Sequence, residues 1–262
     1  MAVNKVNKRD GTTLIDISDS TVSAATLAQG YKAYDADGNA VNGALVPATD
    51  NLPLFLSGNT ITGFSNSDIT AIKSYAAYRD SGLQTVSIPN VTTINTSAFE
   101  YSRIQSLNAP AATTLDDYAL HGCSRLTTLN LNSLTYLGEA AISSCGNLVS
   151  INLPAIQSMN IKAFAGSYSL EEIRLGEDFE TFYTAYSANE AQFYDTPYLE
   201  RLIIEASTPP RLRSTYLFGA AGAIPEYTTA TFGIYVSDKT VYAAASNWSA
   251  FSSYLHDISE LS

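Results

Sequence analysis

The residue types that most often carry out chemistry are few in this sequence, and their spacing matches no catalytic pattern. There are two histidines, His121 and His256, and two cysteines, Cys123 and Cys145. Neither histidine is spaced from a serine and an aspartate as in a known catalytic triad, and there is no G-x-S-x-G motif and no glycine-rich phosphate loop. We therefore predict a non-enzymatic protein with no catalytic residue and no cofactor.

One short motif, DADGN at residues 35–39, has the oxygen spacing that opens a calcium loop. Such a loop needs a bidentate carboxylate at its twelfth position, and that position is Val46. The Asp-Gly pair inside the motif favours a hairpin turn. We therefore predict a hairpin turn with a calcium loop as the alternative, and no metal site elsewhere, because two cysteines and two histidines leave few ligands for zinc.

Carboxylates gather in one stretch late in the sequence. They are Glu171, Glu172, Glu177, Asp178 and Glu180. A pair of catalytic acids would need a cleft across which two carboxylates face each other. The simpler interpretation of this stretch is an acidic face in contact with solvent.

The charge balance excludes some partners. With 14 Lys and Arg against 25 Asp and Glu, the formal net charge is −11, so the chain lacks the cations that bind nucleic acid or anionic membranes. The first ten residues are polar, and no segment approaches the roughly 18 apolar residues of a membrane span. If Met1 is the native start, we expect synthesis in a cytosol, no export signal and no membrane insertion.

An internal repeat of about 22 residues organises the middle of the chain, with units at residues 70–91, 92–112, 113–134, 135–156 and 157–178. The seventh residue of every unit is an alanine: Ala76, Ala98, Ala119, Ala141 and Ala163. Apolar residues then recur with the spacing LxxLxL, at Leu83/Val86/Ile88, Ile104/Leu107/Ala109, Leu126/Leu129/Leu131, Leu148/Ile151/Leu153, Leu170/Ile173/Leu175 and, in a sixth copy, Leu199/Leu202/Ile204.

This pattern predicts an α/β solenoid. Residues alternate sides along a strand, so the last two apolar positions of LxxLxL point inward and the residue between them points outward. No unit can bury its apolar face alone, and stacking the units creates one continuous core with a parallel sheet on one face. The alanine column suits a tight turn or short helix on the opposite wall.

The two cysteines are 22 residues apart and share a column of adjacent units. They should therefore lie side by side, which makes a disulfide conceivable. A buried ladder of unbonded thiols, continued by Ser102 and Ser167, is the alternative that we favour, because free cysteine packs well in cores.

The repeats resemble the BspA-like class of leucine-rich repeats over residues 61–210. The resemblance rests on Ala163-Phe164, on Cys145 and on the run from Leu148 to Pro154 that carries L-x-x-I-x-L-P. It implies a leucine-rich-repeat solenoid and, by analogy with surface adhesins of this type, a protein that binds host proteins.

The rest of the chain does not follow the 22-residue repeat. Residues 1–46 read as a small β-rich attachment or oligomerisation module, 47–69 as a linker and N-terminal cap, 70–210 as the repeats, and 211–262 as a strand-helix cap. Residues 11–43 resemble the segment found ahead of variable domains in tail-associated proteins of phages of Gram-positive hosts. In the C-terminal cap, Asp238 is a candidate helix N-cap, and a helical face is predicted from Val241, Ala244, Ala245, Trp248 and Phe251.

Outward strand positions and an aromatic insertion supply the candidate ligand-binding residues. Short polar side chains on the strands can hydrogen-bond sugars or protein loops, and Tyr is enriched at binding surfaces. The candidates are Gln84, Ser87, Gln105, Asn108, Thr128, Asn130, Asn152 and Arg174 on the sheet, with Tyr183, Tyr186 and Tyr194 in the insertion. The alternatives are amides that pair with one another along the sheet and tyrosines that pack over a widened coil.

Two functions fit these observations. The first is a phage or prophage protein, located in the virion, whose repeats bind a host-surface glycan or protein and whose residues 1–46 contact other virion proteins or form a homo-oligomer. The second is a bacterial adhesin at the cell surface. Neither involves nucleic acid.

Overall fold

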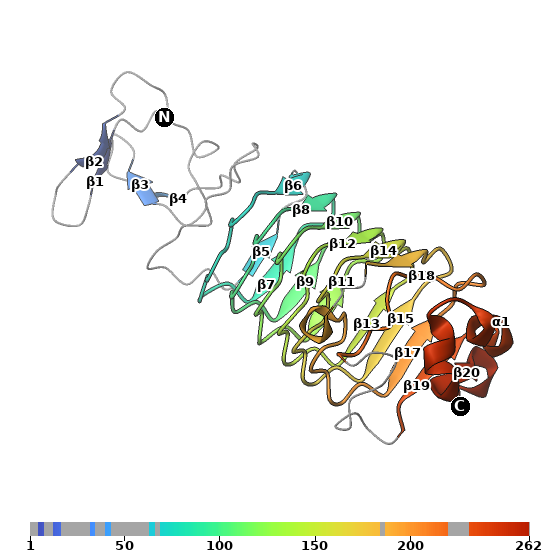
Figure 1. The fold of residues 1–262 in the computed structure, drawn as a ribbon. Coiled ribbons are helices and arrows are strands. Elements are labelled where there is room, and N and C mark those ends of the chain that lie inside the picture. Colours follow the sequence, from blue (N-terminus) through green and yellow to red (C-terminus); the bar gives the residue numbers. More distant parts are fainter. Residues whose placement is uncertain are drawn as a thin grey trace. The chain divides into compact units, whose positions relative to one another are not determined.

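The computed structural model describes residues 69–183, 187–219 and 231–261, together with the backbone of strands within 5–7, 13–16, 32–34, 40–42 and 63–65. The chain divides into two compact units, Met1–Asn51 and Leu52–Ser262 (Figure 1). The domain boundaries drawn from the sequence stay predictions.

The first unit contains four short strands in two antiparallel pairs. Strand β1 (Lys5–Asn7) pairs with β2 (Thr13–Asp16), and β3 (Lys32–Tyr34) pairs with β4 (Ala40–Asn42). The β3–β4 pairing is the arrangement that a hairpin at residues 35–39 requires. The DADGN motif itself lies outside the described residues.

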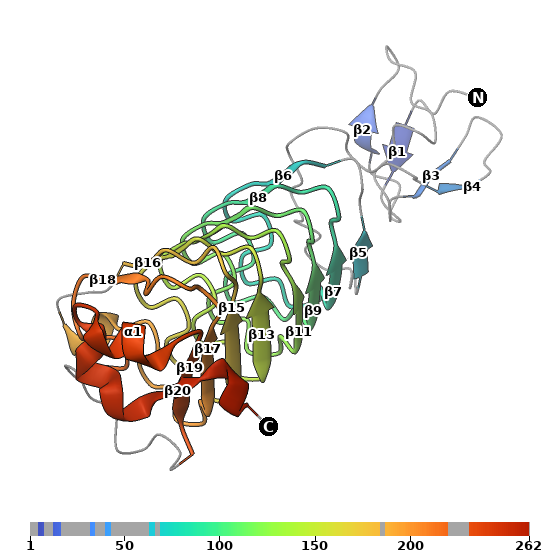
Figure 2. The ribbon, with the colours of Figure 1, turned by 90° about the vertical axis from the view of Figure 1, so that its right-hand side faces the viewer.

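The second unit is a solenoid whose coils each contribute one strand to a front face (Figures 1 and 2). The front strands run parallel in two sheets. The first holds β5 (Gly63–Ser65), β7 (Thr85–Ser87), β9 (Ser106–Asn108) and β11 (Thr128–Asn130). The second holds β13 (Ser150–Leu153), β15 (Glu172–Leu175), β17 (Arg201–Ile204), β19 (Gly233–Val236) and β20 (Leu255–Asp257).

A second wall, the back sheet, is made of seven parallel strands in register. These are β6 (Ala71–Ile72), β8 (Thr93–Ile94), β10 (Thr114–Leu115), β12 (Tyr136–Leu137), β14 (Ser158–Met159), β16 (Thr181–Phe182) and β18 (Arg211–Leu212). Threonine hydroxyls reinforce this wall, since Thr113 Oγ1 donates to the carbonyl of Thr92 at 3.2 Å and Thr135 Oγ1 to that of Thr113 at 3.0 Å. The predicted parallel solenoid is confirmed.

We number coils 1 to 5 as residues 70–91, 92–112, 113–134, 135–156 and 157–178. In each coil the segment between the back strand and the front strand forms a third wall, the turn face. In each coil the backbone of this wall enters the left-handed region twice. Examples are Tyr75 and Arg79 in coil 1 and Ser97 and Tyr101 in coil 2. These reversals point backbone N–H groups along the solenoid axis, so that the N–H of Ala77 donates to the carbonyl of Ala98 at 2.6 Å.

The core fills the space between the three walls. The inward positions of every LxxLxL copy are buried except Leu129, and the alanine column is buried throughout. The turn wall is built from tight turns, which is the first of the two arrangements that the alanine column predicted.

The C-terminal cap differs from its predicted helix. Asp238 is the N-cap of α1 (Lys239–Ala244), accepting from the backbone N–H of Thr240 at 2.8 Å and of Val241 at 3.2 Å. The continuous helical face is wrong, because α1 ends at Ala244 and the chain enters the left-handed region at Asn247. Val241 and Ala244 are therefore exposed.

The buried residues of the cap come from several short elements. A 3₁₀ helix, η3 (Trp248–Tyr254), supplies Trp248 and Phe251, and α1 supplies Tyr242. Two shorter 3₁₀ helices are η2 (Ala188–Glu190) and η4 (Ile258–Glu260). Among the residues placed by the structure, no helix has the length and apolarity to cross a bilayer.

Candidate recognition surface

The outward side chains of the front strands form two columns across the coils. Strand register places Thr128 beside Ser106 of coil 2, and Asn130 beside Asn108. In the second sheet Ser150 lies beside Glu172, and Asn152 beside Arg174. The structure therefore brings most of the predicted sheet candidates to one face: Ser87, Asn108, Thr128, Asn130, Asn152 and Arg174.

The two glutamine candidates precede their strands and also act through their backbone. The N–H of Gln105 donates to the carbonyl of Gln84 at 2.7 Å, and the carbonyl of Gln105 accepts from the N–H of Thr127 at 2.9 Å. The Gln105 side chain is exposed, whereas that of Gln84 is half-buried. Both residues therefore lie at the entry to the front face.

Amide side chains pair along part of the face. Asn130 Nδ2 donates to Asn108 Oδ1 at 2.8 Å, and Asn108 Nδ2 donates to Ser87 Oγ at 3.3 Å. This pairing is the alternative raised from the sequence, and it covers coils 1 to 3. Within the described structure, Asn152 does not join the ladder and remains exposed.

The ladder stops because the front face is interrupted between coils 3 and 4. Strands β11 and β13 belong to separate sheets, although the back strands β10 and β12 of the same two coils stay paired. The turn face also stays paired, with the N–H of Leu120 donating to the carbonyl of Ala141 at 2.8 Å. Coils 3 and 4 are thus joined on two walls and open on the third, which leaves Leu129 half-buried and Asn130 Oδ1 buried without a partner in the described region.

Hydrogen exchange should locate this opening. We expect the amides of Leu131 and Ser150 to exchange at least about tenfold faster than their equivalents Ala109 and Glu172, because the latter donate to Asn130 and Val149 and the former lack such bonds among the described atoms. Mass-spectrometric or NMR exchange on the full chain measures the difference. Equal protection of the two pairs would show that the front sheet is continuous.

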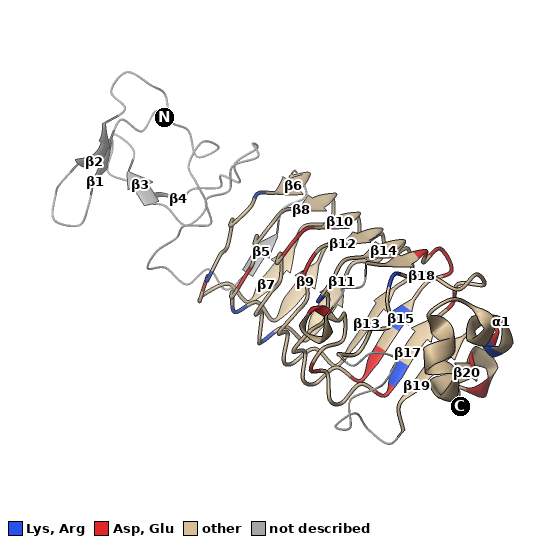
Figure 3. Cartoon of the chain, in the orientation of Figure 1, with Lys and Arg blue, Asp and Glu red and all other residues tan. Residues whose placement is uncertain are grey.

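Charged residues replace neutral ones at the C-terminal end of the face (Figure 3). Arg201 Nε donates to Glu172 Oε2 at 2.7 Å, and Arg174 Nη1 donates to Glu205 Oε1 at 2.6 Å. The hydrogen bond to Glu172 raises the pKa of Arg201 further. The predicted candidate Arg174 is therefore neutralised by an ion pair at the boundary between a neutral and a charged half of the face.

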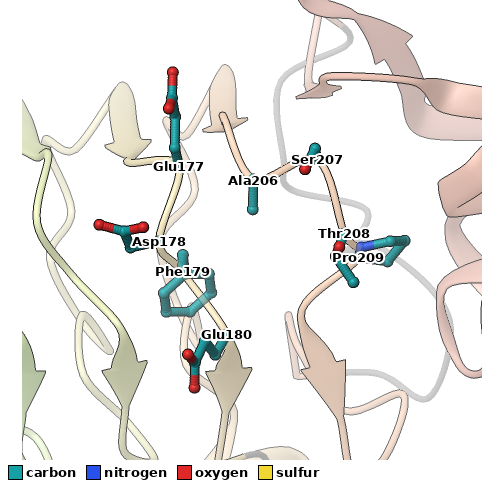
Figure 4. A pocket seen from close by; sticks show the side chains of 8 residues that line it. All are labelled: Glu177, Asp178, Phe179, Glu180, Ala206, Ser207, Thr208 and Pro209. Carbon is teal, nitrogen blue, oxygen red and sulfur yellow. The ribbon is translucent and has the colours of Figure 1, made fainter.

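Three carboxylates of the late acidic stretch, those of Glu177, Asp178 and Glu180, line a pocket of about 370 Å³ with Phe179 and Ala206 to Pro209. Figure 4 shows the carboxylates of Glu177, Asp178 and Glu180 pointing in three different directions. They do not face one another as an acid–base pair would. Among the described residues, no group of three or more His, Cys, Asp and Glu side chains could hold a metal ion.

The described tyrosines of the insertion have different neighbours. Tyr183 is half-buried beneath the guanidinium of Arg213, 5.0 Å from the ring centroid. Tyr194 is 38% exposed and packs beside Gly219. Tyr186 lies outside the described residues.

A different set of aromatic residues, of which only His121 was considered from the sequence, gathers on the turn face. We call Tyr75, Tyr78, Tyr101, Tyr118 and His121 the aromatic cluster. Its rings meet edge to face, with centroids 5.8 Å apart for the first pair, 6.3 Å for Tyr78 and Tyr101, and 5.0 Å for Tyr101 and His121. These residues fall in three columns of the repeat, and other residue types occupy the same columns in the remaining coils, so no periodic signal marks them.

His121 is held in this cluster by two hydrogen bonds. Its Nδ1 lies 2.6 Å from Ser143 Oγ, and its Nε2 lies 3.0 Å from the hydroxyl of Tyr101. Ser143 Oγ donates to the carbonyl of Ala140, so Nδ1–H donates to Ser143 and Nε2 accepts from Tyr101. Burial lowers the pKa of His121, which favours this neutral form.

Residues 70–200 match the family model of the BspA type leucine rich repeat region, in six copies. The chain belongs to this family. A leucine-rich repeat protein from Bacteroides ovatus ATCC 8483, known from a crystal structure, is similar to it with 20% identity and a TM-score of 0.49. The similarity covers 68% of this chain and 43% of that protein, so the chain spans less than half of its length. No curated protein matches the chain.

The cysteine column of the BspA-type repeats is a ladder of free thiols. Cys123 and Cys145 are unbonded and buried. Cys123 Sγ donates to the carbonyl of Phe99 at 3.1 Å and lies 3.5 Å from Ser102 Oγ, while Cys145 Sγ donates to the carbonyl of Leu120 at 3.3 Å. The favoured interpretation of this column is correct, and the thiols fasten one coil to the backbone of the coil before it.

These thiols should not react in the folded protein. Burial raises the pKa of Cys123 to about 12 and that of Cys145 well above its usual value, so the reactive thiolate is scarce at pH 8. We expect no measurable reaction of the native BspA-type array with Ellman's reagent, and two thiols per chain after denaturation. Rapid labelling of either thiol in the native protein would show that the turn face opens.

Proposed function

We propose that this BspA-type repeat protein is a non-enzymatic recognition protein whose front face binds a protein on the surface of a bacterial cell. The observation that carries the proposal is the exposure of polar side chains on successive front strands, at Asn108, Thr128, Ser150 and Asn152. No described element covers them. A neutral face of Ser, Thr and Asn offers adaptable hydrogen bonds to a second folded surface, as antibody paratopes do.

A substitution at the centre of the face tests this role. Thr128→Arg places a long cation on an exposed strand position, and we expect it to weaken binding of the labelled full chain to intact Gram-positive cells at least about tenfold, since a buried unpaired charge is costly at an interface. The control is Gln157→Arg, which adds the same charge at an exposed position beside the back sheet. Equal binding of the two variants, or no binding by the unaltered chain, would contradict the proposal.

The setting that we propose is a phage or prophage tail, with residues 1–46 contacting other virion proteins or forming a homo-oligomer. The support is the resemblance of residues 11–43 to segments of tail-associated proteins. Immunogold labelling of induced phage particles with antibodies to the full chain tests it, and labelled particles are the expected result. Particles without label would overturn this setting while leaving the front-face proposal intact.

A cell-surface adhesin is the second candidate, and membership of the BspA-type family favours it. In this case antibodies should label intact producing bacteria and not phage particles. Labelled bacteria in a strain without induced phage would decide for the adhesin.

A further inference from the structure

The exposed side chains of the turn face have an unusual composition. In the described structure eight large hydrophobic side chains are exposed, and six of them are tyrosines. Three belong to the aromatic cluster on coils 1 and 2: Tyr75 is 54% exposed, Tyr78 37% and Tyr101 45%. No aliphatic side chain is among the exposed residues here, so the surface offers rings and hydroxyls and little else that is apolar.

The ring of Tyr101 is fixed in place although it is exposed. It lies over Gly122, where an added Cβ would come within 2.4 Å of Tyr101 Cδ1. Its hydroxyl donates to His121 Nε2 at 3.0 Å, and the two rings meet edge to face. A ring held by Gly122 and His121 loses little conformational entropy when a ligand rests on it, so the surface is preorganised for binding.

Arg79 supplies a cation beside this ring, and the residue that precedes Tyr101 in the chain, Glu100, supplies a carboxylate. The guanidinium of Arg79 lies 5.1 Å from the centroid of Tyr78 and 5.6 Å from that of Tyr101, and no carboxylate of the described residues lies within ion-pair distance of it. Glu100 precedes Tyr101, is half-buried, and acts electrostatically on His121. The site therefore combines a group that only donates hydrogen bonds with a group that only accepts them.

We propose that Tyr78, Arg79, Glu100 and Tyr101 form a binding site for a neutral saccharide. A sugar ring has an apolar C–H face that packs on an aromatic ring, and hydroxyls that both donate and accept hydrogen bonds. The tyrosines meet the first requirement, and Arg79 and Glu100 meet the second. The opposite charges of Arg79 and Glu100 cancel, and the net charge of −11 on the chain disfavours an anionic polymer.

The site is separate from the front face, since its residues lie on the turns between back and front strands. The front-face variant Thr128→Arg should therefore keep saccharide binding. Failure of the chain to bind cells, with saccharide binding kept, would count against the proposed function alone. Failure to bind saccharides, with cell binding kept, would count against the saccharide site alone.

Saturation-transfer NMR on the full chain tests the site. The probes are maltotriose, chitotriose, lactose and the mannose disaccharides as neutral saccharides, with 3′-sialyllactose as the anionic comparison. We expect transfer to at least one neutral saccharide. Transfer to none of them, or to 3′-sialyllactose alone, would overturn the proposal.

Variants assign the binding to named side chains. Tyr78→Ala removes a ring, and Arg79→Gly removes the guanidinium at a position whose φ of 56° suits glycine, so the second variant keeps the fold. We expect each to weaken saccharide binding at least about fivefold, which corresponds to about 1 kcal/mol per interaction. Tyr198→Ala, which alters a tyrosine that is 59% exposed beyond coil 5, is the matched control and should bind as the unaltered chain does. Unchanged binding in both cluster variants would overturn the assignment.

Discussion

Replacement of Gly176 by alanine is expected to destabilise coils 4 and 5 by about 3 kcal/mol or more, at the upper end of the cost of overpacking. An added Cβ at this position would come within 1.8 Å of the carbonyl oxygen of Pro154 and 2.9 Å of its Cα. The N–H of Gly176 also donates to the carbonyl of Leu153 at 3.1 Å. Because the obstacle is backbone, no side-chain rotation relieves the clash, and the two coils must move apart.

Thermal unfolding followed by circular dichroism measures this effect, and Gly146→Ala is its control. An added Cβ at Gly146 meets nothing within 4 Å, so this variant should unfold at the temperature of the unaltered chain or slightly above it. A Gly176→Ala protein with unchanged stability would mean that the coils approach each other less closely than the structure has them.

Truncation of Trp248 to alanine is the second change with a large expected effect. The indole is 1% exposed and packs against Tyr242, Phe182 and Phe251, with ring centroids 5.2 to 6.3 Å away. Its Nε1–H donates to the carbonyl of Pro210 at 2.6 Å. Loss of a buried aromatic side chain costs about 3–5 kcal/mol, and here it also leaves a buried carbonyl without its donor.

The loss of stability should extend beyond the cap to the neighbouring coils, because the last coil of a solenoid depends on its cap to cover the core. Urea unfolding of Trp248→Ala, followed by circular dichroism, measures it. Val241→Ala serves as the control, since Val241 is 46% exposed and shortening it should change the free energy of unfolding by less than about 0.5 kcal/mol. Similar midpoints for the two variants would show that the cap contributes little to the array.

The solenoid could be predicted from the sequence because the apolar pattern that produces it recurs in each repeat. The LxxLxL spacing fixes which residues point inward, and the alanine column fixes where the coils come closest. Asp238 could also be identified as a helix cap, because its side chain acts on backbone N–H groups only two and three residues away. Each of these features depends on local sequence or on a strict period.

Other features depend on contacts that no period encodes. The units around Leu129 and Ile151 follow the LxxLxL pattern as well as any others, so nothing in them predicts that strands β11 and β13 stay unpaired. Tyr78 and Tyr101 occupy different columns and meet only because the left-handed turns bring them to one wall. The cap helix was predicted too long because the chain leaves the helix after Ala244 and turns through the left-handed region at Asn247, so that Trp248 and Phe251 lie on a separate 3₁₀ helix.

The interruption between coils 3 and 4 has a consequence for the way the array unfolds. In a solenoid each coil contacts only its neighbours, so cooperativity passes along the chain through successive interfaces. The interface between coils 3 and 4 has hydrogen bonds on two walls, whereas the interfaces beside it have them on three. Denaturation should therefore proceed in two steps, with coils 1 to 3 and the coils that follow them behaving as separate cooperative blocks.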